Sequence, residues 1–349
     1  MSRMVRIYFG YTTRNSMYNL YQWQLRKDIQ SGVYKKIYAI IPLFDQEYNA
    51  VIRSRKIWPV TIQRIQILWV ERPDNKQYTQ AQLKMFRTRM YTNYPHAVFV
   101  QFGLLNEIIH FQNRAEKRPN FEQDMRINRE LLHTYMEERF ALKPAFRENM
   151  PQANVVYDVK HTDEELIADM NKSCKARVKK SLKSDITFNV APGEYYDEFY
   201  KQRIRLAGSK WFNIITPDQF RDLMRYLKEN QCGEIFIAEK DGELVAGSIC
   251  LFDQDRIIYL YGFANRTFQK ISGHHFLKFK KFGRARDHNI QTCDMLGAAP
   301  TGYPEHSLAG VSKFKESLGW TKIEMYGSYD LPLKPLLYRL VKWVYKRRG

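Results

Sequence analysis

Hydrophobic and polar positions along the first half of the chain predict alternating strands and helices. Short apolar runs predict four strands, at Lys36–Ile41, Ala50–Arg55, Ile62–Val70 and Ala97–Gln101. Longer stretches predict three helices, at Asn15–Gln30, Gln80–Asn93 and Phe111–Ala145. Pro144 and Pro151 then precede an apolar strand at Val155–Val159. We therefore place a boundary there, between an N-terminal domain at 1–153 and a C-terminal domain at 154–349.

The second half opens with a helix start signal and a regular apolar stripe. Thr162 and Glu165 have the spacing of a capping box. Five apolar residues then recur every four positions, namely Leu166, Met170, Cys174, Val178 and Leu182. This spacing predicts one helix over Asp163–Lys183 with one face toward a core.

Strand and helix patterns continue through the rest of the second half. Further helices are predicted at Glu194–Ala207, Pro217–Asn230, Gly273–Arg286 and Ser312–Leu318. Strands are predicted at Ile186–Val190, Ile235–Glu239, Leu244–Phe252, Arg256–Phe263 and Gln291–Met295. Asp241 and Gly242 lie between two of these strands and predict a hairpin turn. Hairpin strands combined with crossover helices predict an α/β fold with a mixed sheet.

The composition is that of a folded chain without a membrane span. Of the 349 residues, 44% are hydrophobic, which is enough for the cores of two domains and excludes a disordered chain. No apolar run approaches the roughly 18 residues of a membrane helix, and the start lacks the apolar core of a secretory signal. The four cysteines form no CxxC pair and the eight histidines are scattered. We expect reduced thiols, no metal site and a cytoplasmic location.

Positive charge is built into both halves of the chain. The net charge is +19, with 24 basic and 13 acidic residues before residue 155 and 32 and 24 after it. Such an excess indicates a phosphate-bearing partner: nucleic acid, a nucleotide or an anionic membrane face. The densest cluster contains no acid and comprises Lys172, Lys175, Arg177, Lys179, Lys180 and Lys183. We interpret it as a helix surface that binds an anionic partner, the alternative being a solvated face.

The order of elements in the second half matches acyltransferases of the GNAT type. Such enzymes usually hold the pyrophosphate of CoA on a glycine-rich turn, through backbone N–H groups. The corresponding turn here, Gln269–His274, has Ser272 and His274 where small residues are usual. Either another acyl donor is used or the chain is not a transferase.

Five segments resemble, in the same order, motifs of the FemABX peptidyltransferases, whose members resemble two GNAT domains in tandem. They are the strand MPQANVVYDV, the basic helix NKSCKARVKKSLK, the Tyr-rich strand IIYLYGFAN, the strand end DMLGAAP and the segment GVSKFKESLGW. The tail YDLPLKPLLYRL also fits, whereas the first half is similar only through LYQWQLRK and AVFVQFG. The resemblance implies two tandem GNAT-like domains with mixed sheets, the N-terminal one divergent.

The resemblance implies transfer of an amino acid from aminoacyl-tRNA to an amine of a peptidoglycan precursor, lipid-linked or UDP-linked, to form a peptide cross-bridge. The aminoacyl ester is already activated, so positioning and oxyanion stabilisation suffice and no cofactor is expected. A tRNA acceptor stem is held mostly through phosphates and 2′-hydroxyls, which agrees with a basic helix that has no base-reading motif.

The resemblance also implies roles for residues near the acyl group. Lys315, beside Phe314, matches the lysine placed near the reacting ester, where it would stabilise negative charge. Tyr261 matches a tyrosine on the substrate side, while Tyr259, on the same strand face, could belong to the core. Asp294 fits the strand-end motif and would orient a group. The alternatives are a solvated Lys315 and an Asp294 that only caps a turn.

Two further positions match family residues that bind substrate phosphate. They are Arg205, in a predicted helix, and Lys27, within Trp23–Lys27. Arg203 lies roughly 200° around the same helix from Arg205, so only one of the two can face a given site. A surface position is the alternative for both Arg205 and Lys27.

Two other functions remain open at this point. One is an N-acyltransferase that uses acyl-CoA or an acyl carrier, and the other is a non-catalytic RNA-binding protein. For the aminoacyl-tRNA-dependent transferase, we expect a monomer.

The C-terminal segment has helical apolar spacing beside a basic face. Its apolar positions are Leu333, Leu336, Leu337, Leu340, Val341 and Val344. We expect Leu333–Leu340 to dock on the protein and Trp343, Tyr345 and 346–348 to touch anionic lipid, a peripheral contact.

Overall fold

The computed structural model describes residues 38–43, 46–57, 60–70, 80–112, 120–148, 150–191, 195–210, 215–253, 256–319 and 321–347. The predicted helix at Asn15–Gln30 and the candidate residue Lys27 lie outside these ranges.

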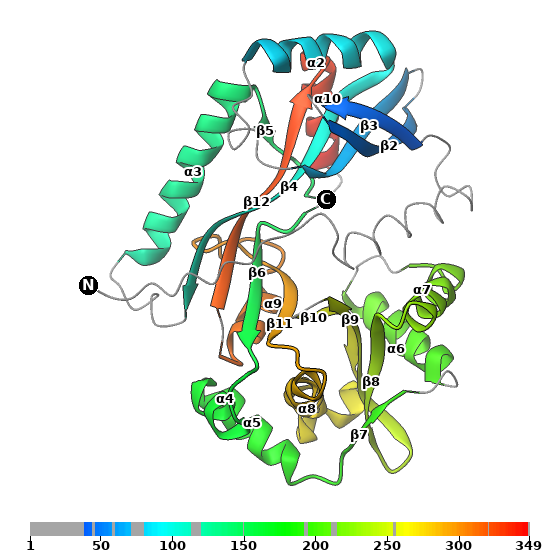
Figure 1. The fold of residues 1–349 in the computed structure, drawn as a ribbon, viewed down its shortest axis with the longest axis vertical. Helices are drawn as coiled ribbons and strands as arrows, with labels where there is room; N and C mark the ends of the chain where they lie inside the picture. Colours follow the sequence, from blue (N-terminus) through cyan, green and yellow to red (C-terminus); the bar gives the residue numbers. More distant parts are fainter. Residues whose placement is uncertain are drawn as a thin grey trace.

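One mixed sheet runs through both halves of the molecule (Figure 1). Its strands lie in the order β1 (Tyr38–Leu43), β2 (Gln46–Ile57), β3 (Val60–Val70), β4 (Ala97–Gln112), β12 (Thr321–Pro332), β6 (Ala153–Asp158), β11 (Thr292–Ala298), β10 (Arg256–Ala264), β9 (Glu243–Asp253), β8 (Gly233–Lys240) and β7 (Thr187–Val190). A two-residue strand, β5 (Lys143–Pro144), pairs with β12. The β3–β4 and β10–β11 pairs are parallel and the others antiparallel, so the predicted mixed sheet is confirmed.

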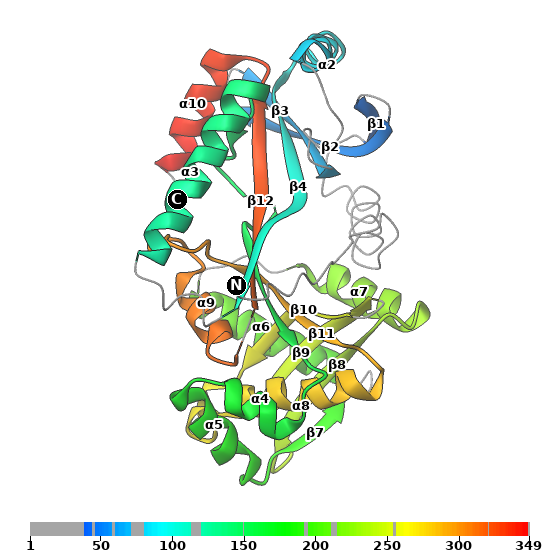
Figure 2. The same cartoon turned by 60° about the vertical axis from the view of Figure 1, so that its left-hand side comes forward.

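Helices cover both faces of the lower part of the sheet (Figure 1). On one face lie α4 (Asp163–Asp169), α5 (Lys172–Leu182) and α8 (Gly273–Asp287), and on the other α6 (Tyr196–Lys210) and α7 (Pro217–Glu229). The short helices η4 (Arg266–Ile271) and α9 (Ala309–Glu316) flank α8 and β11 in the chain. The upper part carries α2 (Gln80–Asn93), α3 (Phe121–Phe140) and α10 (Pro335–Lys346), and Figure 2 shows α3 and α10 beside the β4–β12 ribbon.

The strand β12 joins the two parts and has no counterpart in the sequence prediction. Its first residues pair with β6, and it pairs with β4 along its whole length. Glu324, Ser328 and Asp330 are buried in it, so an apolar strand pattern is absent. Its second half and α10 pack into the core of the upper part. The boundary between 153 and 154 stays a prediction.

Two helix predictions were wrong in part, one in its interior and the other at both ends. The expected helix over Asp163–Lys183 is interrupted, because Met170 and Asn171 adopt extended backbone angles and Asn171 caps a second helix, α5. The capping box at Thr162 and Glu165 is confirmed in both directions. The expected helix over Phe111–Ala145 is shorter, since β4 continues to Gln112 and α3 covers Phe121–Phe140.

The hairpin predicted at Asp241 and Gly242 is confirmed. Both residues have positive φ, 51° and 78°, as a two-residue turn with the twist of the flanking strands requires. The turn connects β8 to β9, and these strands bring their inner residues against α8.

Candidate active site

A cavity of about 200 Å³ lies where α8 and α9 meet β9 and β10. Most of its wall is apolar. The polar and aromatic side chains that line it are Ser248, Tyr259, Phe263, His274, Lys278, Phe314 and Lys315. A concave, mostly apolar space with a few convergent polar groups is the usual form of a site for a small chemical group.

Lys315 lies in the wall of this cavity and is held by backbone oxygens. Its side chain is buried, and Nζ donates hydrogen bonds to the carbonyls of Leu296, at 2.7 Å, and Gly297, at 2.5 Å. The Tyr157 hydroxyl donates to the Lys315 carbonyl and so ties α9 to β6. Burial lowers the pKa of Lys315 to about 8, although the charge of Asp294 acts in the opposite direction.

Asp294 shapes the strand end that holds Lys315. It is buried within β11, just before an irregularity in the strand's pairing with β6, where its carboxylate accepts a hydrogen bond from the Leu296 N–H at 2.7 Å and lies 3.5 Å from Arg256. Leu296 has a positive φ of 52°, which the Asp294 hydrogen bond helps to hold. Because the Leu296 and Gly297 carbonyls then accept from Lys315, the predicted residues Asp294 and Lys315 lie in one connected arrangement.

Phe314 packs against two histidines at the start of α8. Its ring centre lies 5.0 Å from that of His274 and 5.3 Å from that of His275. Burial lowers the pKa of His274 to about 4 and that of His275 to about 3, so both rings are neutral at pH 7. Phe314 and the neutral His274 ring form one aromatic side of the cavity, with His275 packed against Phe314.

Tyr259 and Tyr261 lie on opposite faces of β10, contrary to the sequence expectation. A β-bulge between them shifts the register against β9, and a bulge turns residues that would share a face away from each other. Tyr259 faces α8 and lines the cavity, whereas the guanidinium of Arg203 lies 5.2 Å from the centre of the Tyr261 ring. Tyr261 therefore belongs to the α6 side of the sheet.

Of the two arginines of α6, Arg203 is the one that faces the sheet. Its Nη1 donates to the Gly262 carbonyl at 2.8 Å, and Gly262 lines the cavity. The predicted phosphate ligand Arg205 is exposed, and its guanidinium lies 4.0 Å from Glu198 on the same helix. The structure therefore does not bring Arg205 to the cavity.

The basic cluster predicted for tRNA lies on α5 and its C-cap. Lys172, Arg177, Lys179, Lys180 and Lys183 are exposed, and Lys175 is half-buried with its amine donating to the Ala168 carbonyl. The charge of Arg177 lowers the pKa of His274 and of His275. The middle of the cluster therefore lies near the start of α8.

Two buried lysines on α8, Lys278 and Lys281, were missed by the sequence analysis. Lys278 lines the cavity, and Lys281 is fully buried beside it. The available signal was the stripe of His274, Lys278, Lys281 and Ala285, which alternates steps of four and three along one helix face. Two lysines on the helix face that packs against the sheet predict amines buried in the protein.

In the turn before α8, a backbone N–H is used within the turn, and Gly273 packs closely against β9. Ser272 has a positive φ of 59°, and its N–H donates to the Gln269 carbonyl. A Cβ on Gly273 would lie 1.9 Å from Val245, so only glycine allows α8 to approach β9 this closely.

Within the described ranges, no group of three or more His, Cys, Asp or Glu side chains could hold a metal ion.

Comparison with known proteins agrees with this fold. Residues 213–346 match the FemAB family. Lipid II:glycine glycyltransferases from two strains of Staphylococcus epidermidis are each 27% identical to this chain over 114 residues, which is 33% of this chain. That stretch spans only 27% of the length of these curated relatives. In fold, the chain is similar to the crystal structure of FemX, with a TM-score of 0.63 and 15% identity over 91% of this chain and 93% of FemX.

The fold shared with FemX is that of an α/β protein, with the mixed sheet expected from the sequence. Within that class, the predicted resemblance to the FemABX family is confirmed. The residues that match the FemAB family, 213–346, include Lys278, Phe314, Lys315 and every other residue that lines the cavity except Leu206.

Proposed function

We propose that this chain is an aminoacyltransferase that moves an amino acid from aminoacyl-tRNA to an amine of a peptidoglycan precursor. The FemAB match and the glycyltransferase relatives support a transferase of cross-bridge synthesis. The observation that carries the proposal is the position of Lys315, whose amine is held by two carbonyls in the wall of a small apolar cavity. The cavity takes the aminoacyl group and the acceptor amine.

Lys315 stabilises the oxyanion that forms when the amine attacks the ester carbonyl. Two of its three N–H bonds point to Leu296 and Gly297, which leaves one for the developing negative charge. A donor held in place in an apolar site stabilises such charge more strongly than water does. Phe314 and the neutral His274 ring cover the other side of the acyl group.

The tRNA donor binds along α5. The exposed bases there carry no acid among them, as expected for contacts with phosphates. The charge of Arg177, in the middle of α5, acts on His274 at the start of α8, so the 3′ end of the acceptor stem reaches the cavity from that side. The protein acts as a monomer and uses no cofactor.

A lipid-linked precursor would bring the enzyme to the cytoplasmic face of a membrane, and α10 supplies a surface for this contact. Leu336, Leu340 and Trp343 are 81%, 52% and 51% exposed and lie on one side of the helix. The opposite side is docked, since Tyr338 is buried and its hydroxyl donates to Asp330 at 3.0 Å. We expected the first part of the helix, up to Leu340, to dock and the last residues to be exposed, which was wrong. Instead, one side of the helix docks along its length and the other side is exposed.

Charge on α10 suits an anionic lipid surface. Arg339 is exposed, Lys342 is half-buried, and the guanidinium of Arg347 lies 3.9 Å from the centre of the Trp343 ring. Each base near an anionic leaflet adds about 1 kcal/mol of attraction.

None of the helices that the structure describes has the length and apolar character needed to span a bilayer.

The test is a transfer assay with the full chain, a panel of charged tRNAs and a lipid-linked or UDP-linked precursor. The expected result is an aminoacylated precursor and an equal amount of deacylated tRNA, for one or a few of the tRNAs. Thiol release from acyl-CoA without tRNA turnover would contradict the proposal and support the acyl-CoA alternative.

A further inference from the structure

The amine of Lys278 lies in the cavity wall without an oxygen partner. The side chain is 8% exposed, and its nearest contacts are the Met295 sulfur at 3.9 Å and the Tyr259 ring, whose centre is 4.2 Å away. The Phe314 ring centre lies 5.0 Å from the same amine. Within the part of the chain that the structure describes, Lys278 has neither a carboxylate nor a carbonyl to accept its protons. A charged ammonium in such surroundings is costly.

The groups that face Lys278 from the neighbouring elements supply no negative charge at neutral pH. Burial raises the pKa of the Cys250 thiol on β9 to about 11, and it also raises the pKa of the Cys293 thiol on β11 and of the Tyr259 phenol on β10. His274 on α8 is neutral because burial lowers its pKa to about 4. These four groups are therefore uncharged at pH 7.

The charges that do face Lys278 are positive. They are those of Lys281, one turn further along α8, and Lys315 on α9. Burial, followed by these two charges, holds the pKa of Lys278 well below the ordinary value of 10.5. Lys315 differs because its amine has two carbonyl acceptors, which favour the protonated form. The surroundings thus favour the neutral form of the Lys278 amine, while the two carbonyls favour the protonated form of the Lys315 amine, and opposite preferences of this kind are the usual arrangement of a base and an acid.

We propose that Lys278 is the general base of the acyl transfer. The inference rests on the proposed function and adds a proton acceptor to it. The acceptor nitrogen attacks the ester carbonyl carbon, a C–N bond forms, and the carbonyl electron pair moves to the oxygen, beside Lys315. The neutral Lys278 amine takes the proton from that nitrogen. The C–O bond then breaks, the ribose oxygen leaves with its electron pair, and Lys278 returns the proton to it.

Two substitutions of Lys278 separate a base from a binding cation. Lys278→Met keeps the volume but removes the amine, and Lys278→Arg keeps a positive charge that does not leave at accessible pH. A general base contributes about 10²–10⁴-fold to rate, so both variants are expected to lose turnover by about that factor at saturating substrates. Circular dichroism and thermal unfolding confirm that each variant is folded. Full activity of a folded Lys278→Met or Lys278→Arg protein would overturn the proposal.

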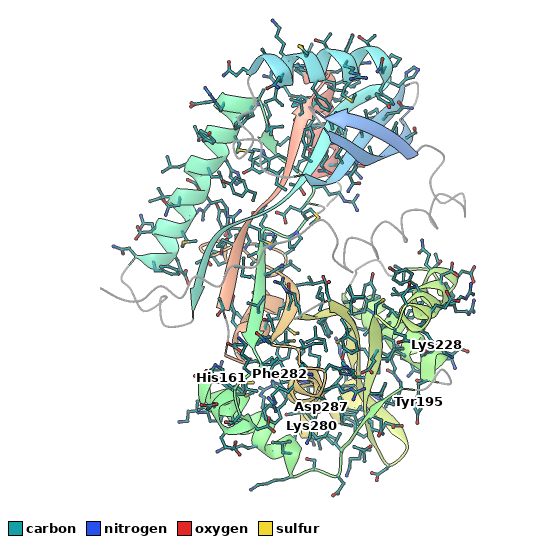
Figure 3. All side chains as sticks on the ribbon, viewed as in Figure 1. His161, Tyr195, Lys228, Lys280, Phe282 and Asp287 are labelled. Carbon is teal, nitrogen blue, oxygen red and sulfur yellow. The ribbon has the colours of Figure 1, made fainter. Side chains whose placement is uncertain are left out.

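Lys280→Met on the same helix is the matched control. Lys280 is exposed, whereas Phe282, two positions further along α8, is fully buried, and both are labelled in Figure 3. Lys280 is not part of the cavity wall. Its replacement is therefore expected to leave turnover unchanged.

A measurement without tRNA tests the protonation state of Lys278 directly. Only neutral amines react with formaldehyde and cyanoborohydride, so the pH dependence of methylation, followed by mass spectrometry of each lysine, reports the pKa of each amine. Methylation of Lys278 is expected to reach half its maximum rate at a pH well below that of Lys280. A half-maximum equal to that of Lys280 would overturn the inference and leave the proposed function intact. If the unsubstituted protein transfers nothing, the proposed function fails and the base role fails with it.

Discussion

Lys278 and Lys315 present their amines to one cavity, but only the Lys315 amine has oxygen acceptors. The Lys315 amine donates to the carbonyls of Leu296 and Gly297, while the Lys278 amine contacts a sulfur and two aromatic rings. The pKa of Lys315 is lowered to about 8 by burial, and that of Lys278 is lowered well below 10.5 by burial and by two neighbouring lysines. This difference determines how transfer depends on pH.

Transfer is expected to give a bell-shaped pH profile. The rate rises with pH as Lys278 loses its proton, because the neutral amine is the active form of a base. The rate falls as pH passes about 8, because Lys315 then loses the proton with which it stabilises the oxyanion. The measurement is kcat/KM for transfer from about pH 5 to about pH 10.

Two variants assign the limbs of this profile. Lys315→Arg keeps its charge at high pH, so any activity it retains is expected to lack the fall near pH 8. Lys281→Met removes a positive charge that lowers the pKa of Lys278, so the rising limb is expected to move to higher pH. A rising limb that stays in place or moves to lower pH would contradict the electrostatic coupling of these two lysines.

Loss of the Lys315 amine is expected to slow transfer without unfolding the protein. We expect Lys315→Ala to lower turnover by about 10²–10³-fold, the usual effect of removing one oxyanion donor. Lys313→Ala is the matched control, because Lys313 is an exposed lysine on the same helix. Single-turnover rates at saturating substrates test this, and equal rates for the two variants would argue that Lys315 has only a structural role.

The bases of α5 are expected to dominate the salt dependence of tRNA binding. Lys179→Glu combined with Lys183→Glu removes two exposed phosphate contacts, so the slope of log K against log salt flattens by about 1.4–1.8 units. Lys228→Glu is the control, since Lys228 is an exposed base of α7, which both views place far from α5 (Figures 1, 2 and 3). An unchanged slope in the double variant would identify α5 as a solvated face.

The exposed side of α10 is expected to hold the protein on anionic vesicles. Leu336→Gln with Leu340→Gln removes apolar contact area that an interfacial helix buries, so co-sedimentation at low salt falls several-fold. Transfer to a soluble, UDP-linked precursor stays the same. Leu131→Gln, at a leucine of α3 that is 62% exposed, is the control. If the unsubstituted protein does not sediment with vesicles at low salt, α10 has no membrane role.

The sequence by itself determined the elements whose signals are local. The helix Gln80–Asn93 has the predicted ends, and the Asp241–Gly242 turn has the predicted backbone. The order of the family segments also follows from the sequence, because it depends on short motifs such as Phe314–Lys315. Such features need only the few neighbouring residues that fix a backbone conformation or define a motif.

Only the tertiary structure decided the features that depend on distant partners. Glu324 is buried in β12 because Arg129, 195 residues earlier, pairs with it at 2.5 Å, so the strand lacks an apolar pattern. The bulge between Tyr259 and Tyr261 arises from pairing with β9, and it moves Tyr261 to the other face of the sheet. Lys278 is a base candidate only because the fold surrounds its amine with sulfur, rings and two other amines. The chemistry of an amine depends on the charges and acceptors around it, and those come together only when the chain folds.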